Sequence, residues 1–342
     1  MKVLHIGSSN KFTTQLFSFL GETFDLGNHL FLSYQTQIAW PDKYKEHYVE
    51  KNGYRFFIHL LLKGIASDKI ILHCLPTGRY LLFLLLQPWL LKKCWWVVWG
   101  GDLYLHEESH KTFRWYKNEV IRKIVIKRIG QLITYIEGDV ALARQWYGAK
   151  GQYHECLMYP SNLYKEYDVP QKEHAIVNIQ VGNSADPSNN HLEVFEKLIP
   201  YKDQDIKIFV PLSYGDQIYA KNIVEVGRRM FGNKFVPLTS FMPFEEYLKF
   251  LGQIDIAVFN HRRQQAMGNT ITLLGLGKSV YIRSDTTQWK IFKKIDITIY
   301  DISKLNDKNK LLTKTLPDNI EKIKKYFCIQ NLERQWSAIF NG

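Results

Sequence analysis

Three polar loops in the second half of the sequence each follow an apolar, strand-like run. The first reads VGNSADPSNNH, in which Gly182 and Ser184 permit a tight turn and Asn183 offers a side-chain donor. Backbone N–H groups that converge in such a turn can bind a phosphate oxygen. The alternative is an ordinary turn that precedes a helix, with Ser188 or Asn190 as its N-cap. The sequence leaves both interpretations open.

The second loop lies in FVPLSYGD, where a strand ends in Ser213 and Tyr214. An aromatic side chain at that edge is able to stack on a base or a sugar. The motif alone indicates only a turn. We keep both residues as candidate donor ligands because the loop belongs to the same series.

The third loop, RRQQAMGNT, follows the strand-like run DIAVF and precedes an apolar, helix-like pattern. A helix start carries free N–H groups and a partial positive charge, an adjacent arginine can fork onto a phosphate, and glutamine can bond a sugar hydroxyl. The alternative is a solvated loop whose helix is capped by Asn269 or Thr270. We expect the ligands of a phosphorylated sugar to be Arg263, Gln264, Gln265, Gly268, Asn269 and Thr270.

In the first half, the string WVVWGGDLY presents Asp102 just after a buried strand and two glycines. A carboxylate at the carboxyl edge of a sheet can act as a general base. The alternative is that Asp102 caps the following segment. His73 ends a neighbouring strand and faces the same edge, whereas His5 lies within the first strand. A lone histidine is more often a hydrogen-bonded core residue, so the sequence leaves both histidines open.

Residues 111–130, KTFRWYKNEVIRKIVIKRIG, carry seven Lys or Arg against one acid and are interleaved with apolar and aromatic residues. A basic amphipathic helix of this kind fits an interfacial contact with anionic lipid. The alternatives are a solvated surface helix and a nucleic-acid contact, although no nucleic-acid-binding motif accompanies it. The candidate membrane residues are Lys111, Arg114, Trp115, Lys123 and Lys127.

These loops must be positioned by strands and helices, and strand-like and helix-like patterns alternate along the whole chain. That alternation is typical of an α/β protein with parallel sheets. The 342 residues exceed one ordinary core and fit two domains. A net charge of +12 favours an anionic partner. In doubly wound sheets, ligands bind beyond the carboxyl ends of the strands.

We predict a first domain over residues 1–160, a linker over 161–174, a second domain over 175–325 and a C-terminal helix over 326–342. The last thirty residues read as one long amphipathic helix. The apolar run from Tyr80 to Leu91 is too short to span a membrane and predicts a buried helix.

Several classes of protein are disfavoured by what the sequence lacks. The single glycine of HIGSSNKF does not make a dinucleotide fingerprint, and no Walker A motif is present. The four cysteines lie far apart, which predicts reduced thiols rather than disulfides or a zinc site. The N-terminus lacks the apolar core of a signal peptide, so we expect a cytoplasmic protein.

The strings WGGDLY, VGNSADPSNNH, VPLSYGD and RQQAMGNTITLLGLGKSV, in this order, resemble glycosyltransferase family 56. This is the family of TDP-N-acetylfucosamine:lipid II N-acetylfucosaminyltransferases, or 4-alpha-L-fucosyltransferases. Gly101 stands where the family has alanine, and Ala266–Met267 where it has Gly-Ile, which leaves the sugar open. The family motif carries over onto Trp99, Gly100, Asp102, Gly182, Asn183, Ser184, Arg263, Gln264, Gln265 and Gly268.

The resemblance implies a GT-B architecture, in which two Rossmann-like doubly wound domains face each other across a cleft. The second domain would hold the nucleotide-sugar and the first the lipid-linked acceptor, with Trp99 and Gly100 as acceptor contacts. His73 is a further candidate acceptor contact because of its place at the end of a neighbouring strand. The resemblance also implies a role in enterobacterial common antigen or a related surface polysaccharide, at the cytoplasmic face of the inner membrane.

The leading hypothesis is a peripheral hexosyltransferase that moves a deoxy-amino-sugar from a dTDP donor to an undecaprenyl-diphosphate-linked saccharide. We expect neither a metal nor another cofactor, and no nucleic-acid partner. Asp102 is the candidate base if the anomeric centre inverts, and it orients the acceptor if the centre is retained. The alternatives are a non-catalytic nucleotide-sugar or phospholipid-binding module and a basic nucleic-acid-binding protein.

Overall fold

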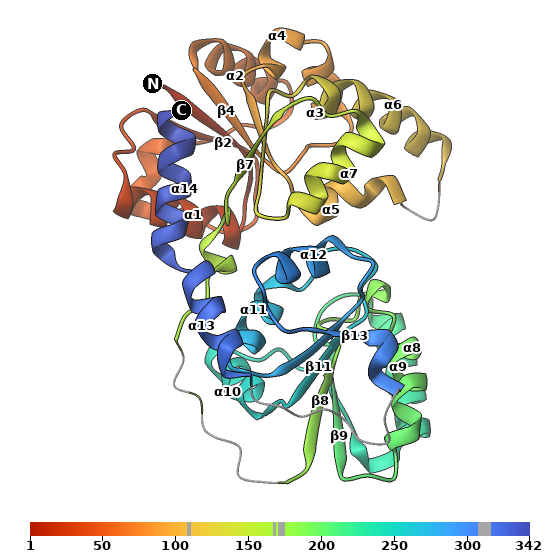
Figure 1. Cartoon of the computed structure of the whole chain (residues 1–342). Coiled ribbons are helices and arrows are strands. Elements are labelled where there is room, and N and C mark those ends of the chain that lie inside the picture. The colour runs from red at the N-terminus through yellow and green to blue at the C-terminus, as the bar shows by residue number, and fades with distance from the viewer. Residues whose placement is uncertain (108–110, 167–168, 170–174, 307–315) are drawn as a thin grey trace. The chain divides into compact units, whose positions relative to one another are not determined.

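The computed structural model describes residues 1–107, 111–166, 169, 175–306 and 316–342. The chain divides into two compact units (Figure 1). Unit 1 consists of residues 1–163 together with 329–342, and unit 2 consists of residues 164–328. Each unit is built on one parallel sheet and is described by itself.

The sheet of unit 1 has seven strands in the order β3-β2-β1-β4-β5-β6-β7, all parallel. The central strands are almost entirely buried, as strands covered on both faces are. The strands are β1 (Val3–Ser9), β2 (His29–Thr36), β3 (Tyr48–Glu50), β4 (Lys69–His73), β5 (Cys94–Val97), β6 (Gln131–Thr134) and β7 (Gln152–Glu155).

Helices cover both faces of this sheet. The helices are α1 (Lys11–Thr23), α2 (Gly53–Ala66), α3 (Arg79–Leu85), α4 (Pro88–Leu91), α5 (Gly100–Leu103), α6 (Phe113–Arg128), α7 (Glu137–Tyr147) and α14 (Ile329–Asn341), with short 3-10 turns η1 (Asp42–His47), η2 (Tyr104–Glu107) and η3 (Pro160–Asn162). One core joins the sheet to α2, α3, α4, α6 and α7. On the other face, α1 packs with η1 and η3.

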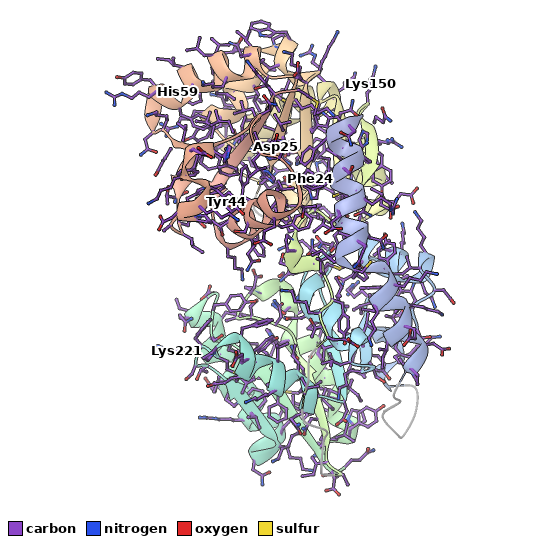
Figure 2. All side chains as sticks on the ribbon, turned by 90° about the vertical axis from the view of Figure 1, so that its left-hand side faces the viewer. Phe24, Asp25, Tyr44, His59, Lys150 and Lys221 are labelled. Carbon is purple, nitrogen blue, oxygen red and sulfur yellow. The ribbon has the colours of Figure 1, made fainter. Side chains whose placement is uncertain are left out.

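The C-terminal helix α14 belongs to unit 1, although it follows unit 2 in the chain. Trp336 is fully buried and donates through Nε1 to the carbonyl of Met158, at 3.1 Å. The ammonium of Lys69, on β4, donates to the carbonyl of Phe340, at 3.3 Å, in the last turn of α14. The ring of Phe24 meets that of Phe340 edge-on, and Figure 2 shows Phe24 beside this helix. The chain end is therefore fastened to the first sheet.

The sheet of unit 2 has six parallel strands in the order β10-β9-β8-β11-β12-β13. This is the order of the Rossmann fold. The strands are β8 (Val177–Val181), β9 (Ile206–Pro211), β10 (Phe235–Leu238), β11 (Ile256–Phe259), β12 (Ser279–Ile282) and β13 (Tyr300–Asp301). The helices are α8 (His191–Leu198), α9 (Gln217–Phe231), α10 (Phe244–Gln253), α11 (Met267–Gly275), α12 (Thr287–Lys294) and α13 (Pro317–Tyr326), with 3-10 turns η4 (Pro187–Asn189), η5 (Ile199–Tyr201), η6 (Gly232–Lys234) and η7 (Ile302–Asn306).

The predicted α/β class with two Rossmann-like domains is confirmed, and two local predictions are corrected. The last thirty residues form two helices rather than one, because the chain turns between α13 and α14 at Phe327 and Cys328. The run from Tyr80 to Leu91 is broken before Pro88 into α3 and α4, and several of its side chains are exposed. The short strands β3 and β7 lack an apolar run, so the sequence did not indicate them. Part of the predicted linker 161–174 lies outside the described residues.

Candidate functional site

The loop that follows β8 in unit 2 begins with a turn that only glycine can make. Gly182 has a φ of +67°, and a Cβ there would lie 2.6 Å from His191 Nε2 and 2.7 Å from Asn189 Oδ1. Its N–H donates to the carbonyl of Val258 on β11, at 3.0 Å. The turn therefore brings the backbone of residues 182–184 to the carboxyl end of the sheet.

Two buried residues that sequence reasoning did not assign to the site hold this loop in place. Asn189 Oδ1 accepts from Asn183 N and pairs with His261 Nε2, both at 2.9 Å. Asn189 Nδ2 donates to Ser184 Oγ at 3.2 Å. Burial lowers the pKa of His261 to about 3, so its imidazole is neutral and donates from Nε2. The position of His261 directly after a buried strand was the only signal in the sequence.

Backbone hydrogen bonds join the loop after β9 to the loop after β8. Ala185 N donates to the carbonyl of Tyr214 at 2.8 Å, and Asp216 N donates to the carbonyl of Ala185 at 2.9 Å. Asn183 Nδ2 donates to the Tyr214 hydroxyl at 2.9 Å. The phenol of Tyr214 is thereby fixed, while its side chain remains 56% exposed and open to a ligand. Ser213 is half-buried in the same loop.

The loop after β11 separates its two arginines. Arg262 pairs with Glu193 at 3.5 Å, and Arg283 also approaches that carboxylate, at 3.9 Å. Arg263 makes no ion pair within the described part of the chain, and its guanidinium donates a long hydrogen bond to the carbonyl of Gln264, at 3.5 Å. Its charge is close enough to Asp186 to help lower the pKa of that carboxyl against the opposing effect of burial. Arg263 is therefore the arginine left for an anionic ligand.

Two glutamines connect this loop to its neighbours. The Ser188 hydroxyl donates to Gln265 Oε1 at 2.9 Å, which ties the loops after β8 and β11 together. The buried Gln288 donates through Nε2 to the Thr270 hydroxyl, at 3.1 Å. The latter hydroxyl also donates to the carbonyl of Ala266, at 3.0 Å. Thr270 therefore supports the loop, and its buried hydroxyl is already engaged.

Helix α11 begins at Met267, two residues before the predicted cap. Its N-cap is Ala266, which has a φ of +57° and supplies no side-chain hydrogen bond. The alternative interpretation, a cap supplied by Asn269 or Thr270, is therefore wrong. The N–H groups near Gly268 form a helix start without a capping side chain, which is suited to an anion.

Together, the three loops form one edge of unit 2, at the carboxyl ends of β8, β9 and β11, and this edge is the candidate site for an anion. Among the described residues, no three His, Cys, Asp or Glu side chains cluster in a way that could hold a metal ion. The sequence does contain one Asp-x-Asp spacing, at Asp203 and Asp205. This pair precedes β9 and so lies at the amino end of its strand, away from the loops.

In unit 1, Asp102 is buried at the start of α5, with 4% of its surface exposed. Its Oδ2 accepts from Leu75 N and Trp96 Nε1, both at 2.7 Å. Its Oδ1 is buried and has no hydrogen-bond partner among the described residues. Burial raises the pKa of Asp102 to about 6, although the two hydrogen bonds and the charge of Arg122 act in the opposite direction. The carboxylate ties the end of β4 to β5 and keeps one oxygen without a donor.

A chain of hydrogen bonds runs from Trp99 into the core of unit 1. Trp99 Nε1 donates to the Tyr159 hydroxyl at 3.1 Å, which in turn bonds His73 Nδ1 at 2.9 Å. His73 Nε2 meets His5 Nδ1 at 3.0 Å, and His5 Nε2 meets His29 Nδ1 at 3.1 Å. Burial lowers the pKa of all three histidines, to about 3 for His73 and about 4 for His29.

Two proton arrangements satisfy all four contacts of this chain. If the Tyr159 hydroxyl donates to His73, the neutral imidazoles carry their hydrogens on Nε2; if it accepts from His73, they carry them on Nδ1. Both ring nitrogens of His73 are thus engaged within the protein. Its role toward an acceptor is therefore indirect, through Tyr159 and Trp99. Gly100 is buried beside them at the start of α5.

The basic helix predicted over residues 111–130 is α6, and four of its five candidate membrane residues are exposed cations: Lys111, Arg114, Lys123 and Lys127. Trp115 is not a free anchor, because its Nε1 donates to the carbonyl of Leu105 at 2.8 Å. Phe113, by contrast, is 87% exposed. No helix in the described ranges is both long and apolar enough to cross a bilayer.

Solved structures with the same overall fold cover essentially the whole chain. WaaG, a glycosyltransferase involved in lipopolysaccharide biosynthesis, is 13% identical, with 99% of this chain and 100% of that chain covered and a TM-score of 0.64. HepE of Anabaena, solved with UDP and glucose, is 11% identical, with 100% of both chains covered and a TM-score of 0.66. Sucrose-phosphate synthase of Thermosynechococcus elongatus is 13% identical, with 100% and 98% covered and a TM-score of 0.65. At these identities the likeness shows the GT-B fold alone.

The resemblance predicted from the four sequence motifs is confirmed by a comparison with family models. The model described as 4-alpha-L-fucosyltransferase glycosyl transferase group 56 matches residues 53–341. This range includes Asp102, the donor-side loops and α14. Because the match spans most of the chain, the protein belongs to the 4-alpha-L-fucosyltransferase family, glycosyl transferase group 56, and is a glycosyltransferase.

Proposed function

We propose that this glycosyltransferase moves a deoxy-amino-sugar of the N-acetylfucosamine type, or a similar hexose, from a dTDP-sugar to an undecaprenyl-diphosphate-linked saccharide. The family is described as fucosyltransferases, which supports a deoxy-hexose donor. The product would enter enterobacterial common antigen or a related surface polysaccharide. The enzyme would act as a peripheral protein at the cytoplasmic face of the inner membrane.

The observation that carries the proposal is the pair of arginines after β11. Arg262 is paired with Glu193, whereas Arg263 has no ion pair among the described residues and lies beside an uncapped helix start. A nucleotide-sugar gains negative charge on its diphosphate as the glycosidic bond breaks. Fixed donors that face that charge lower the barrier because they need no reorganisation.

In this proposal the diphosphate is held by Arg263, the first turn of α11 and the turn at residues 182–184, and no metal is required. Tyr214 would stack on the base or the sugar, since its ring is exposed while its hydroxyl is fixed by Asn183. Gln264 and Gln265 would bond sugar hydroxyls. The structure of HepE with UDP and glucose supports a nucleotide-sugar as the donor class.

On the acceptor side, we propose Asp102 as the general base. Its Oδ1 is a buried oxygen without a hydrogen-bond partner, and such an oxygen is costly unless a ligand supplies a donor. An acceptor hydroxyl would be that donor, once it reaches the carboxylate. A pKa of about 6 leaves the base ionised at neutral pH yet basic enough to accept a proton.

The Asp102 proposal predicts a specific pH dependence. Asp102→Asn should lower kcat/KM by about 100-fold or more, and in the native enzyme the rate should fall below a pH of about 6. Trp96→Phe should move this acid limb to higher pH, because it removes a hydrogen bond that stabilises the ionised carboxylate. A D102N enzyme within threefold of the native rate would leave Asp102 only its structural tie to Leu75.

The basic helix α6 would contact anionic lipid through its exposed cations, with Phe113 at the acyl boundary. The combination of cations and exposed apolar side chains supports this assignment. It would hold the enzyme close to an acceptor that is itself anchored in the bilayer.

The proposed reaction is tested by measuring the release of the nucleoside diphosphate from dTDP-, UDP- and GDP-sugars. Each reaction would contain a polyprenyl-diphosphate disaccharide and be run with and without EDTA. We expect dTDP release that depends on the acceptor and is unchanged by EDTA. Thermal shift with each donor separates binding from turnover. Donor binding without any release would indicate a non-catalytic binding module, and loss of activity with EDTA would reject the metal-free mechanism.

A further inference from the structure

Helix α2 of unit 1 shows an apolar face to solvent. Tyr54, Ile58, Leu62 and Ile65 are 69%, 49%, 61% and 55% exposed. Their spacing of four, four and three residues places them on one side of the helix. A surface helix normally keeps that side polar. His59, on the same helix, stands at the outer edge of this unit in Figure 2.

This exposed face is additional to the one that packs on the sheet. Phe56, Leu60 and Gly64 are buried and form the opposite side of α2. The helix is thus apolar on two sides, and the core needs only one of them. The second side is not covered by the described residues of unit 1.

The neighbouring helices α3 and α4 continue the apolar surface. Leu82, Leu86 and Trp89 are 42%, 63% and 55% exposed. Phe57 on α2 packs its ring against those of Tyr80 and Phe83 on α3, with centroids 5.3 and 5.1 Å apart. We call the exposed surface made by these seven side chains the α2–α4 face; its members are Tyr54, Ile58, Leu62, Ile65, Leu82, Leu86 and Trp89.

The charges around the α2–α4 face have one sign. Between residues 51 and 93 the chain carries seven Lys or Arg and a single acid, Asp68. Arg55, Lys63, Arg79 and Lys92 are exposed, and none of them makes an ion pair within the described ranges. Apolar side chains fringed by free cations match the boundary of an anionic bilayer, where acyl chains lie beneath negative headgroups.

The α2–α4 face also leads to the acceptor side of the proposed reaction. A small apolar recess between α2 and α3 is lined by Tyr34, Phe56, Pro76 and Tyr80, among others. Pro76 follows Leu75, whose N–H is bonded to Asp102. A lipid-linked acceptor that entered along this seam would therefore arrive beside the candidate base.

We propose that the α2–α4 face inserts into an anionic lipid bilayer and is the principal membrane-docking surface of the enzyme, with α6 as an electrostatic flank. This inference rests on the proposed function for its lipid-linked acceptor. A second copy of the chain is a poorer occupant, because two faces that each carry the four exposed cations would repel one another. The sequence did not indicate the face, since the apolar run 80–91 was expected to be buried.

The test uses the full-length protein and vesicles of phosphatidylcholine with or without about a third of phosphatidylglycerol. Ile58→Ser with Leu62→Ser should weaken binding to the anionic vesicles by about tenfold or more, because two aliphatic side chains no longer reach the acyl boundary. The matched control is Leu192→Ser with Ile218→Ser, which removes two exposed aliphatic side chains from unit 2. Charge reversal at Lys123 and Lys127 on α6 should have a smaller effect.

Three readouts decide the outcome. Equal vesicle binding by I58S/L62S and the native protein overturns the proposal, provided that their melting temperatures agree. A concentration-dependent dimer that is lost in I58S/L62S would assign the face to a second copy and also overturn it. Quenching of Trp89 by brominated acyl chains, seen as a difference from Trp89→Phe, should confirm insertion, and its absence counts against it.

Activity measurements separate this inference from the proposed function. With a short-chain, water-soluble acceptor, I58S/L62S should match the native rate, whereas its rate with the vesicle-embedded acceptor should fall. If the native enzyme releases no nucleotide with either acceptor, the proposed reaction fails while the vesicle result still stands. If both acceptors are affected equally, the α2–α4 face is not a membrane-docking surface.

Discussion

The two units share a strand order, but helix α1 of unit 1 and helix α11 of unit 2 begin in opposite ways. Helix α1 is capped by Asn10, whose side chain accepts from Phe12 N and Thr13 N at 2.9 and 3.1 Å. Helix α11 begins after Ala266 with no capping side chain. N–H groups that a cap already engages are not available to a phosphate, whereas those of an uncapped first turn are. The loop after β11 therefore offers an anion donors that the loop after β1 does not.

The buried histidines show the same division. In unit 1, His5, His29 and His73 bond to one another and end at Tyr159, inside the core. In unit 2, His261 bonds to Asn189 and so holds a ligand-facing loop. Neutral buried imidazoles thus connect strands of the core in unit 1, whereas in unit 2 a neutral buried imidazole fixes a loop of the candidate binding edge.

The largest effect is expected from a substitution of Arg263, the arginine that we propose to bind the donor diphosphate on unit 2. Arg263→Ala should lower kcat by about 100-fold or more, because a charge contact to the departing diphosphate is lost. Arg262→Ala is the matched control and should stay within a few-fold of the native rate, since Arg262 is 69% exposed and paired with Glu193. Steady-state kinetics with the folded variants decide between them. Equal rates for R263A and the native enzyme would remove Arg263 from the site.

The sequence predicted the scaffold well because both sheets are buried on two faces, and apolar runs such as KIILH and DIAVF have no other stable use. It predicted the position of the three polar loops because glycine and polar residues interrupt those runs at the carboxyl ends, and the role of these loops in binding a donor stays a prediction. It could not predict which of the two arginines lacks an ion pair, since Glu193, the partner of Arg262, lies on helix α8, far away in the sequence. It also missed His261 and Asn189, whose hydrogen bonds join residues 72 positions apart.

The prediction of a buried helix over residues 80–91 was wrong for a related reason. Composition shows that a segment is apolar, but it does not show which sides of the segment the fold covers. The break before Pro88 divides the run, and Leu82, Leu86 and Trp89 face solvent as a result. Only the packing of α2 against α3 reveals that these side chains join an exposed surface.

Two glycines with nearly equal backbone angles sharpen the comparison of the units. Gly182 in unit 2 and Gly148 in unit 1 have φ values of +67° and +66°. A Cβ at Gly182 would strike His191 and Asn189, whereas one at Gly148 would meet nothing within 4 Å. Gly148→Ala should therefore cost about 1 kcal/mol from backbone strain alone. Gly182→Ala should cost about 2–4 kcal/mol, since overpacking adds to the strain.

Chemical denaturation measures both costs, and donor affinity distinguishes them further. G182A should raise the KM for the nucleotide-sugar because the displaced loop carries Asn183 and Ser184. G148A should leave that KM unchanged. Equal losses of stability in the two variants would mean that the loop after β8 yields freely and is not preorganised.

The last expected effect is a loss of stability on acidification. Burial lowers the folded-state pKa of His261 to about 3, against 6.5 when unfolded. Between these values the unfolded chain binds more protons, so stability falls as the pH drops from about 6.5 toward 4. Each such histidine contributes a slope of up to about 1.4 kcal/mol per pH unit. His261→Asn should remove its share of that slope. The measurement is the urea midpoint between pH 6.5 and 4. If the midpoints fell equally steeply for H261N and the native protein, His261 would have to be charged in the folded state over this range. A charged His261 could not hold the loop through Asn189 as the neutral imidazole does.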